Sequence, residues 1–197
     1  MADSRLILAS SSPRRRQLLE EAGYVFDVIA SDVDESNVPP EFHPGDIAEL
    51  LAVRKAQAIA EQYPHSVVLG ADTVVAYGTK TLGKPADAVA AKIMLQTLGG
   101  TAHSVITGVA VVALSRDWIR HTRVLSAVHM RQLTPDEIDR YVATNEWQGK
   151  AGGYGIQDND PFVTRISGCH TNIVGLPMID TIELLQEAGV EPVSPAK

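Results

Sequence analysis

The stretch LILASSSPRRRQLLEEAGYVFDVIA, residues 6–30, contains an expected strand, helix and second strand in succession. Its first four residues form a short apolar run that predicts a buried strand. Ser12 then stands at an N-cap, Pro13 occupies the first helical position, and Gly23 ends the helix. Tyr24 to Ala30 predicts the second strand. This order favours an α/β or mixed architecture.

The rest of the chain continues the alternation of strands and helices. Strands are expected over residues 67–76, 103–114, 118–130 and 162–166, and helices over residues 46–63, 87–98, 134–144 and 177–188. A hairpin around Tyr77-Gly78 can extend the first of these strands. No internal repeat or linker divides the chain, so we expect a single domain over residues 1–197.

Composition narrows the class of protein. Of 197 residues, 45% are hydrophobic and 21% charged, which is ordinary globular usage and excludes disordered, collagen-like and coiled-coil chains. The single cysteine, Cys169, cannot form an internal disulfide, which agrees with a reducing compartment. The net charge of −7 argues against general nucleic-acid binding. No apolar stretch approaches the ~20 residues of a membrane span. We therefore expect a cytoplasmic protein that binds neither nucleic acid nor membrane.

Serines and arginines gather where the first helix begins. Ser10-Ser11-Ser12 supply hydroxyl donors beside the free N–H groups of the helix N-terminus, an arrangement that suits phosphate. Arg14, Arg15 and Arg16 follow at the positive end of the helix dipole, where each cation costs about 0.3–1 kcal/mol. A local rule that is broken in this way often marks a functional site. The alternative is a solvated basic turn, a description that fits Arg16.

Asp72 interrupts the run VVLGADTVVA, residues 67–76. It is the one ionisable residue in a stretch that otherwise predicts a buried strand. A buried carboxylate needs a cation, a metal ion or strong hydrogen-bond donors. Ligand sites in α/β sheets gather at strand ends, so a general base or a metal ligand is one interpretation. A carboxylate that caps a loop or pairs with a structural arginine is the other.

Four further polar residues are candidates for the same site. Glu35 lies in an acidic loop that fits either a hard-cation site or a surface turn. Lys55 has no acid three or four residues away, so it either extends along apolar surface or points its ammonium into a pocket. Lys84 stands between Gly83 and a proline at a loop-to-helix junction and can contact phosphate. Gln157 ends a glycine-rich stretch that either reads a base edge through this side chain or is only a flexible loop.

Several common mechanisms have no signature in the sequence. There is no Walker A sequence, GxGxxG, HExxH or GxSxG. The six histidines are scattered without the spacing of metal ligands, which favours structural roles. Cys169 has no partner motif for nucleophilic catalysis.

Together, the motifs resemble the Maf family of nucleoside triphosphate pyrophosphatases. The matching stretches are LILASSSPRRRQLLEEAG, VDES, RKAQAIA, LGADTVV, LGKP, HSVITGVA, KAGGYGIQ and IVGLP, which run in this order from Leu6 to Pro177. The resemblance implies a mixed, elongated, twisted α/β sheet flanked by helices, with two lobes and an active-site cleft, as in inosine triphosphate pyrophosphatases. It implies hydrolysis of a nucleoside triphosphate to the monophosphate and pyrophosphate.

The resemblance also implies roles for individual residues. Asp72 matches the family's catalytic aspartate, and Lys55 and Glu35 match other polar positions of its active site. The positions that match substrate-binding residues are Ser10, Arg14, Arg15, Lys84, Thr73 and Gln157. Glu35 and Asp72 are the expected ligands of a divalent cation, Mg²⁺ or Mn²⁺, which would bridge them to phosphate. A homodimer is a further expectation.

Three positions carry the expected base preference. Arg14, Thr73 and Gln157 in combination resemble the branch that hydrolyses dTTP and UTP and, by extension, modified pyrimidine nucleotides. The chain departs from that branch at residues 158–161 and at Cys169-His170. Two alternatives therefore stay open. One is a pyrophosphatase for a modified purine such as 7-methyl-GTP. The other is a nucleotide-binding regulator of cell division and septum formation with little catalysis.

Overall fold

A mixed sheet forms the framework of the computed structural model, which describes residues 5–156 and 162–193. In these residues the strands are β1 (Leu6–Leu8), β2 (Asp27–Val28), β3 (Val67–Tyr77), β4 (Lys80–Leu82), β5 (Ala102–Ala113), β6 (Trp118–Met130) and β7 (Val163–Ser167). Their order is β2-β1-β3-β5-β6-β7, with β4 also paired to β3. β2, β1 and β3 are parallel, and the remaining pairs are antiparallel. The expected mixed α/β sheet is confirmed.

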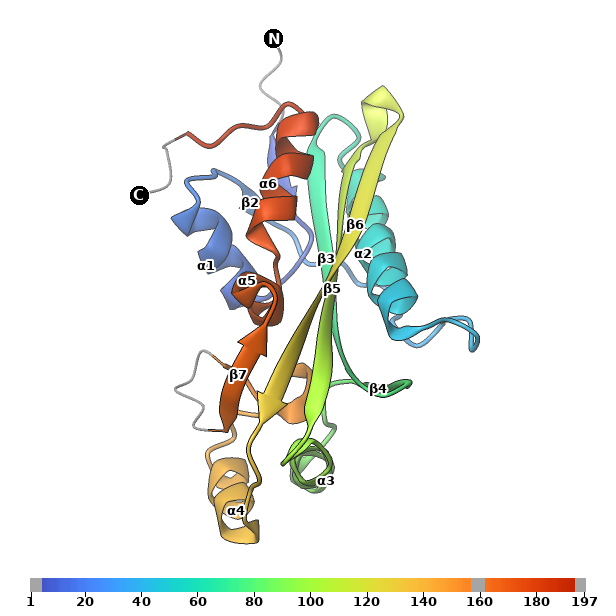
Figure 1. The fold of residues 1–197 in the computed structure, drawn as a ribbon. Helices are drawn as coiled ribbons and strands as arrows, with labels where there is room; N and C mark the ends of the chain where they lie inside the picture. Colours follow the sequence, from blue (N-terminus) through green and yellow to red (C-terminus); the bar gives the residue numbers. More distant parts are fainter. Residues whose placement is uncertain (1–4, 157–161, 194–197) are drawn as a thin grey trace.

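Helices cover both faces of this sheet. The helices of the described residues are α1 (Pro13–Glu21), α2 (Pro44–Ala60), α3 (Ala88–Leu98), α4 (Pro135–Ala143), α5 (His170–Val174) and α6 (Met178–Glu187), with short 3₁₀ turns η1 (Leu114–Arg116) and η2 (Ala151–Gly153). Figure 1 shows α2 on one side of the sheet and α1, α5 and α6 on the other. None of the helices in the described ranges is both long and apolar enough to cross a bilayer.

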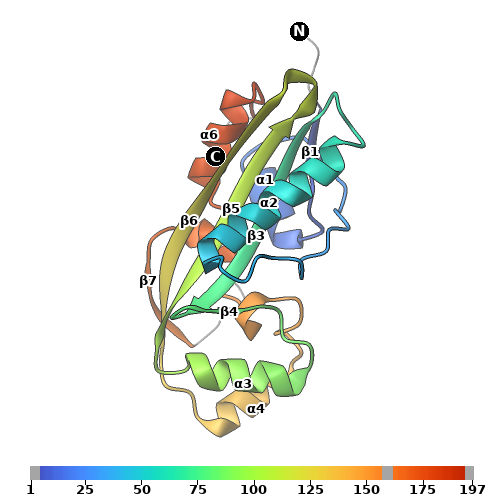
Figure 2. The ribbon, with the colours of Figure 1, turned by 90° about the vertical axis from the view of Figure 1, so that its right-hand side faces the viewer.

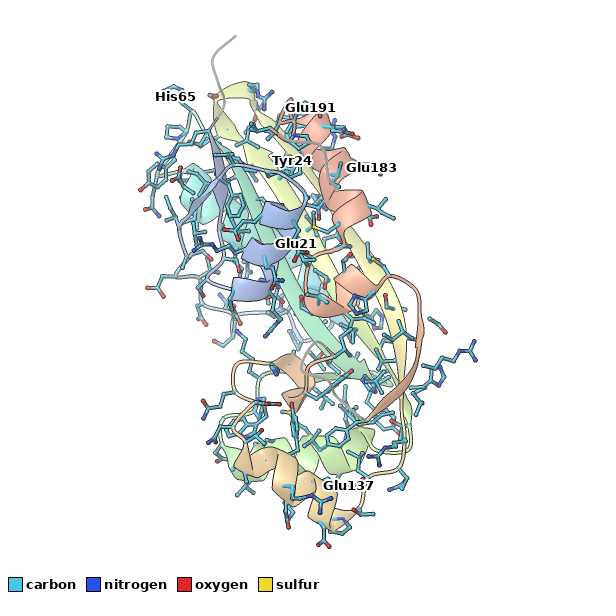
Figure 3. The ribbon with its side chains drawn as sticks, turned by 90° about the vertical axis from the view of Figure 1, so that its left-hand side faces the viewer. Glu21, Tyr24, His65, Glu137, Glu183 and Glu191 are labelled. Carbon is cyan, nitrogen blue, oxygen red and sulfur yellow. The ribbon has the colours of Figure 1, made fainter. Side chains whose placement is uncertain are left out.

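The long strands β3, β5 and β6 connect two lobes. One lobe contains α1, α2 and α6, and the other contains α3, α4 and η2 at the far end of the strands (Figure 2). Each lobe has its own cluster of buried side chains. Figure 3 shows Tyr24 beside α1 and α6 in the first lobe and Glu137 on α4 in the second. The expected two-lobed arrangement is therefore confirmed.

Helix α2 lies unusually close to the sheet because two glycines face it. A Cβ atom on Gly70 of β3 would lie 2.4 Å from the carbonyl oxygen of Ala52. A Cβ atom on Gly108 of β5 would lie 2.3 Å from the carbonyl oxygen of Ala48. Real Cβ atoms do not approach this closely, so only glycine permits the contact. The distance between α2 and the sheet is therefore set by these two positions.

The structure differs from the expectation at two places. The strand expected from Tyr24 to Ala30 shortens to β2, because Tyr24 instead ends α1 in a Schellman motif: its N–H donates to the Leu19 carbonyl, and Gly23 adopts φ of 83°. Helix α5 was not expected. Three other expectations are confirmed. A hairpin follows β3, α1 begins at the proline after Ser12, and α4 begins at the proline after Thr134.

Candidate active site

A gap along one edge of β3 opens into a cavity of about 440 Å³. β1 pairs with β3 only as far as Leu69, and β4 begins to pair at Val75. Among the described strands, residues 70–74 therefore have a neighbour only on the β5 side. Asp72 and Thr73 lie in this gap and both line the cavity.

Strand β3 divides the cavity chemically. Successive side chains of a strand point to opposite faces, so Asp72 faces α2 and Thr73 faces α1 and α5. Asp72 contacts Lys55 of α2, whereas Thr73 contacts Arg15 of α1. The Asp72 side of the cavity is charged. The Thr73 side combines the guanidinium of Arg15 with walls from Val75, Val105, Tyr154, Ile156 and Ile173.

Lys55 bridges two carboxylates on the charged side. Its Nζ atom lies 2.6 Å from Asp72 Oδ1 and 2.7 Å from Glu35 Oε1. Lys55 is 8% exposed and Asp72 is 7% exposed, so this ion pair is shielded from bulk water. The ammonium group therefore points into the pocket, which decides between the two interpretations left open by the sequence. Asp72 Oδ2 has no hydrogen-bond partner among the described residues.

The cations around Glu35 keep it charged. Burial by itself raises the pKa of Glu35, but the hydrogen bond and charge of Lys55 outweigh it, with smaller contributions from Lys84 and Arg15. The net effect lowers the pKa of this carboxyl. Glu35 is therefore a carboxylate at neutral pH, despite its partial burial.

The serine turn before α1 forms the wall between β1 and α1. Ser12 caps the helix by accepting from the Arg15 N–H at 3.4 Å. Ser10 Oγ accepts from the Ser12 N–H at 3.3 Å and from Arg15 Nη1 at 3.0 Å. A hydroxyl has two acceptor positions and one proton. Both acceptor positions of Ser10 are used, so its proton remains for an anion in the cavity.

Arg15 holds this wall together. Its guanidinium donates to Ser10 Oγ, to Thr73 Oγ1 at 2.9 Å, and from Nε to the Gly175 carbonyl at 2.7 Å. It therefore connects the serine turn, β3 and the end of α5. The sequence predicted Arg15 as a substrate-binding residue; the structure places it in the cavity wall, with these three bonds to its own chain.

Two cations in the cavity wall have no such bonds. Neither Arg14 nor Lys84 has a side-chain hydrogen bond or ion pair with another described residue. Burial lowers the pKa of Arg14, although an arginine remains charged throughout the physiological range. Both side chains are therefore available to a negatively charged ligand.

Nearly all of the residues selected from the sequence meet in this one cavity. Its lining includes Ser10, Arg14, Arg15, Glu35, Lys55, Asp72, Thr73 and Lys84. Gln157 lies outside the described residues. The described residues contain no group of three or more His, Cys, Asp or Glu side chains that could hold a metal ion by themselves. Glu35 and Asp72 each contact Lys55 Nζ through one carboxylate oxygen, and Mg²⁺ commonly binds one or two carboxylates together with substrate phosphates.

Sequence reasoning missed several residues of the site. The sequence favoured a structural role for His103, and its ring indeed lies outside the cavity lining, where Nε2 is bonded at 2.5 Å to the hydroxyl of the cavity residue Tyr154. Burial lowers the pKa of His103 to about 4, so this ring is neutral at physiological pH. Lys150 also lines the cavity. The sequence feature that could have identified Lys150 and Tyr154 as cavity residues is their motif, KAGGYGIQ. No local sequence feature separates His103 from the other histidines.

The fold and the cavity define a class: an α/β protein with a cationic, hydroxyl-lined cleft next to a lysine-bridged pair of carboxylates. The family model described as Maf-like protein matches residues 5–188. The chain belongs to the Maf family.

Curated relatives support this assignment. The dTTP/UTP pyrophosphatase of Geobacillus sp. (strain WCH70) is 45% identical over 188 residues, which cover 94% of this chain and 98% of that protein. The dTTP/UTP pyrophosphatase of Pelotomaculum thermopropionicum is 43% identical, with 93% and 96% covered. Among solved structures, a HAM1 protein from Coxiella burnetii aligns at 15% identity with a TM-score of 0.49, over 81% of this chain and 91% of that one.

Proposed function

We propose that this protein hydrolyses dTTP and UTP to the monophosphate and pyrophosphate. The observation that carries the proposal is the Lys55 bridge between Asp72 and Glu35 at a cleft lined by Ser10, Arg14 and Lys84. Membership of the Maf family and the names of its curated relatives support the same reaction.

The charged half of the cavity accommodates the triphosphate. A nucleoside triphosphate brings about four negative charges, which Arg14 and Lys84, cations not paired with a carboxylate among the described residues, offset in part. The free proton of Ser10 and the N-terminus of α1 add donors for phosphate oxygens. This local cluster of donors and cations binds an anion although the whole chain carries a charge of −7.

Asp72 is the proposed base. Its Oδ1 is bound to Lys55, which fixes the carboxylate, while Oδ2 is the oxygen left to accept a proton from water. The water oxygen forms a bond to the α-phosphorus as the bond from that phosphorus to the bridging oxygen breaks. The bond's electron pair leaves with pyrophosphate, and the water proton passes to Asp72.

The donor set also fits a divalent cation. Glu35 would hold Mg²⁺ or Mn²⁺ with the carboxylate oxygen that is not bound to Lys55; Asp72 is the other carboxylate at the site, and its Oδ2 is kept here for the role of base. When bound, such an ion neutralises phosphate oxygens and acts as a Lewis acid at the scissile group. Lys55 keeps both carboxylates in place, and Arg14 and Lys84 orient the phosphates from the other walls.

A panel of nucleoside triphosphates tests the proposal. Pyrophosphate release is measured with Mg²⁺ for the wild type, for Asp72→Asn and for a control, Asp139→Asn, which removes an exposed acid paired with Lys92 on the far lobe. We expect dTTP and UTP to be the preferred substrates. Loss of the base lowers kcat by roughly 10²–10⁴ in Asp72→Asn, while the control keeps wild-type rates. Preferred cleavage of a purine nucleotide would overturn the base preference, and an unaffected Asp72→Asn would overturn the assigned base.

A further inference from the structure

Thr107 is a second threonine next to Thr73, and it has no role in the proposed reaction. Thr107 of β5 is directly opposite Thr73 of β3 in the strand pairing. Thr107 is 0% exposed, whereas Thr73 lines the cavity. The two Oγ1 atoms are 3.0 Å apart. Thr107 therefore contacts a cavity residue without lining the cavity itself.

The direction of the hydrogen bonds in this group is fixed at its buried end. Thr107 Oγ1 lies 2.9 Å from the backbone carbonyl of Asn172 on α5. A carbonyl oxygen only accepts, so the hydroxyl proton of Thr107 lies on this bond. Thr107 then has no proton to give to Thr73. In the contact between the two threonines, Thr73 is the donor.

Because Thr73 donates to Thr107, its hydroxyl can offer only an acceptor position to the cavity. Its single proton is directed to Thr107, and one of its two acceptor positions takes a proton from Arg15 Nη2 at 2.9 Å. One acceptor position remains. The bonds to Arg15 thus leave Ser10 with a proton to donate, whereas Thr107 and Arg15 together leave Thr73 with one free acceptor position.

We propose that Thr107 is a positioning residue that fixes the Thr73 hydroxyl as a hydrogen-bond acceptor, so that this side of the cavity selects a base with an N–H donor. The inference rests on the proposed function. Uracil and thymine in a nucleotide have one ring N–H, at N3, and this donor matches the free acceptor position of Thr73. Cytosine has an unprotonated N3 at the same place, and two facing acceptors repel.

Three variants separate a positioning role from a structural one. Thr107→Val keeps the shape of the side chain and removes its hydroxyl, which frees the Thr73 proton to rotate toward the cavity. Thr107→Ser keeps the hydroxyl. Thr181→Val is the matched control: Thr181 is also fully buried and donates to a carbonyl, that of Pro177, but among the described residues its hydroxyl has no bond to a residue of the cavity lining.

The experiment measures kcat and KM for UTP and CTP and the melting temperature of each variant. We expect the UTP-to-CTP ratio of kcat/KM to fall roughly fivefold to tenfold in Thr107→Val, the effect of about one hydrogen bond. The change lies in KM, with kcat for UTP within about twofold of the wild type, because the Asp72–Lys55 pair is on the opposite face of β3. Thr107→Ser and Thr181→Val keep the wild-type ratio.

Dissociation constants keep the result independent of turnover. Calorimetry gives the dissociation constants of the non-hydrolysable α,β-imido analogues of UTP and CTP, and their ratio is compared between the variants. An unchanged ratio in Thr107→Val, or an equal change in Thr181→Val, would overturn the positioning role, as would failure of Thr107→Ser to retain the ratio. A wild type that binds the uridine analogue without releasing pyrophosphate from UTP would overturn the proposed function and leave this binding test in force.

Discussion

At the scale of single residues, the site depends on one cation between two anions. Lys55 is almost fully buried and contacts both Asp72 and Glu35. Without it, two carboxylates would face each other in a partly desolvated cavity. Removal of one partner from such a group costs more than the group contributes when intact, because uncompensated charge remains.

Lys55→Met tests this dependence through pH. We expect kcat to fall by about 10²–10³, as for loss of one preorganised electrostatic contact. Burial raises and Lys55 lowers the pKa of Glu35, so the variant protonates Glu35 at a higher pH than the wild type. Glu35 must be ionised to serve as the proposed ligand of a divalent cation, so the acidic limb of the pH profile of kcat/KM should move to higher pH.

The pH dependence of the free energy of unfolding has the same origin, the lowered pKa of Glu35. The pKa of Glu35 is lowered in the folded chain, so its carboxylate stabilises the protein above its unfolded pKa. That contribution disappears as pH falls through the lowered value.

The control for the pH profile of Lys55→Met is Lys92→Met, which breaks an exposed pair with Asp139. Identical acidic limbs in Lys55→Met and Lys92→Met would contradict the role given to Lys55.

At the scale of elements, the contact between α2 and β3 sets the position of Lys55. Gly70 lies against the backbone of α2 at Ala52 and Ala56, on either side of Lys55 in the sequence. Asp72 follows Gly70 by two residues and points to the same face of β3. The spacing between helix and strand therefore places the Lys55 ammonium within reach of the Asp72 carboxylate.

Gly70→Ala should disturb both packing and catalysis. Its Cβ would lie 2.4 Å from the Ala52 carbonyl oxygen, so α2 must move away from the sheet. We expect about 1–3 kcal/mol of destabilisation in urea unfolding, together with a fall in kcat. The control is Gly83→Ala, where a Cβ meets nothing within 4 Å. A Gly70→Ala protein with wild-type kcat would show that the helix position does not set the chemistry.

At the scale of the whole molecule, the cavity joins the two lobes. Ser10 and Asp72 belong to the lobe with α1 and α2, whereas Lys84 and Tyr154 come from segments beside α3 and η2. A backbone bond from the Gly152 N–H to the Gly83 carbonyl, at 3.0 Å, connects the loops on that second side. A ligand in the cavity therefore contacts both lobes at once.

Ligand binding should therefore stabilise the fold. At 100 times its dissociation constant, a ligand that binds only the native state adds about 2.7 kcal/mol. For a chain of this size we expect the α,β-imido analogue of dUTP to raise the melting temperature by roughly 5–10 °C. Arg14→Ala should reduce the rise at equal ligand concentration. A melting temperature that does not respond to the analogue would contradict binding between the lobes.

The sequence by itself determined the local features of this protein. Ser12 and Pro13 specify where α1 begins, and the apolar run around Asp72 specifies a buried strand with one carboxylate. These predictions succeed because capping and periodicity depend on residues a few positions apart. The expected strand at Tyr24 failed where the helix end, fixed by Gly23, took precedence over strand propensity.

Only the tertiary structure decided which polar groups meet. Lys55 contacts Asp72 across 17 positions, Thr73 contacts Thr107 across 34, and Thr107 contacts Asn172 across 65. No local pattern encodes such pairs, since they depend on which strands pair and how closely a helix packs on them. The sequence thus determined that a lone carboxylate and a serine–arginine turn exist. The packing of α2 and α5 on β3 and β5 decided what each of them binds.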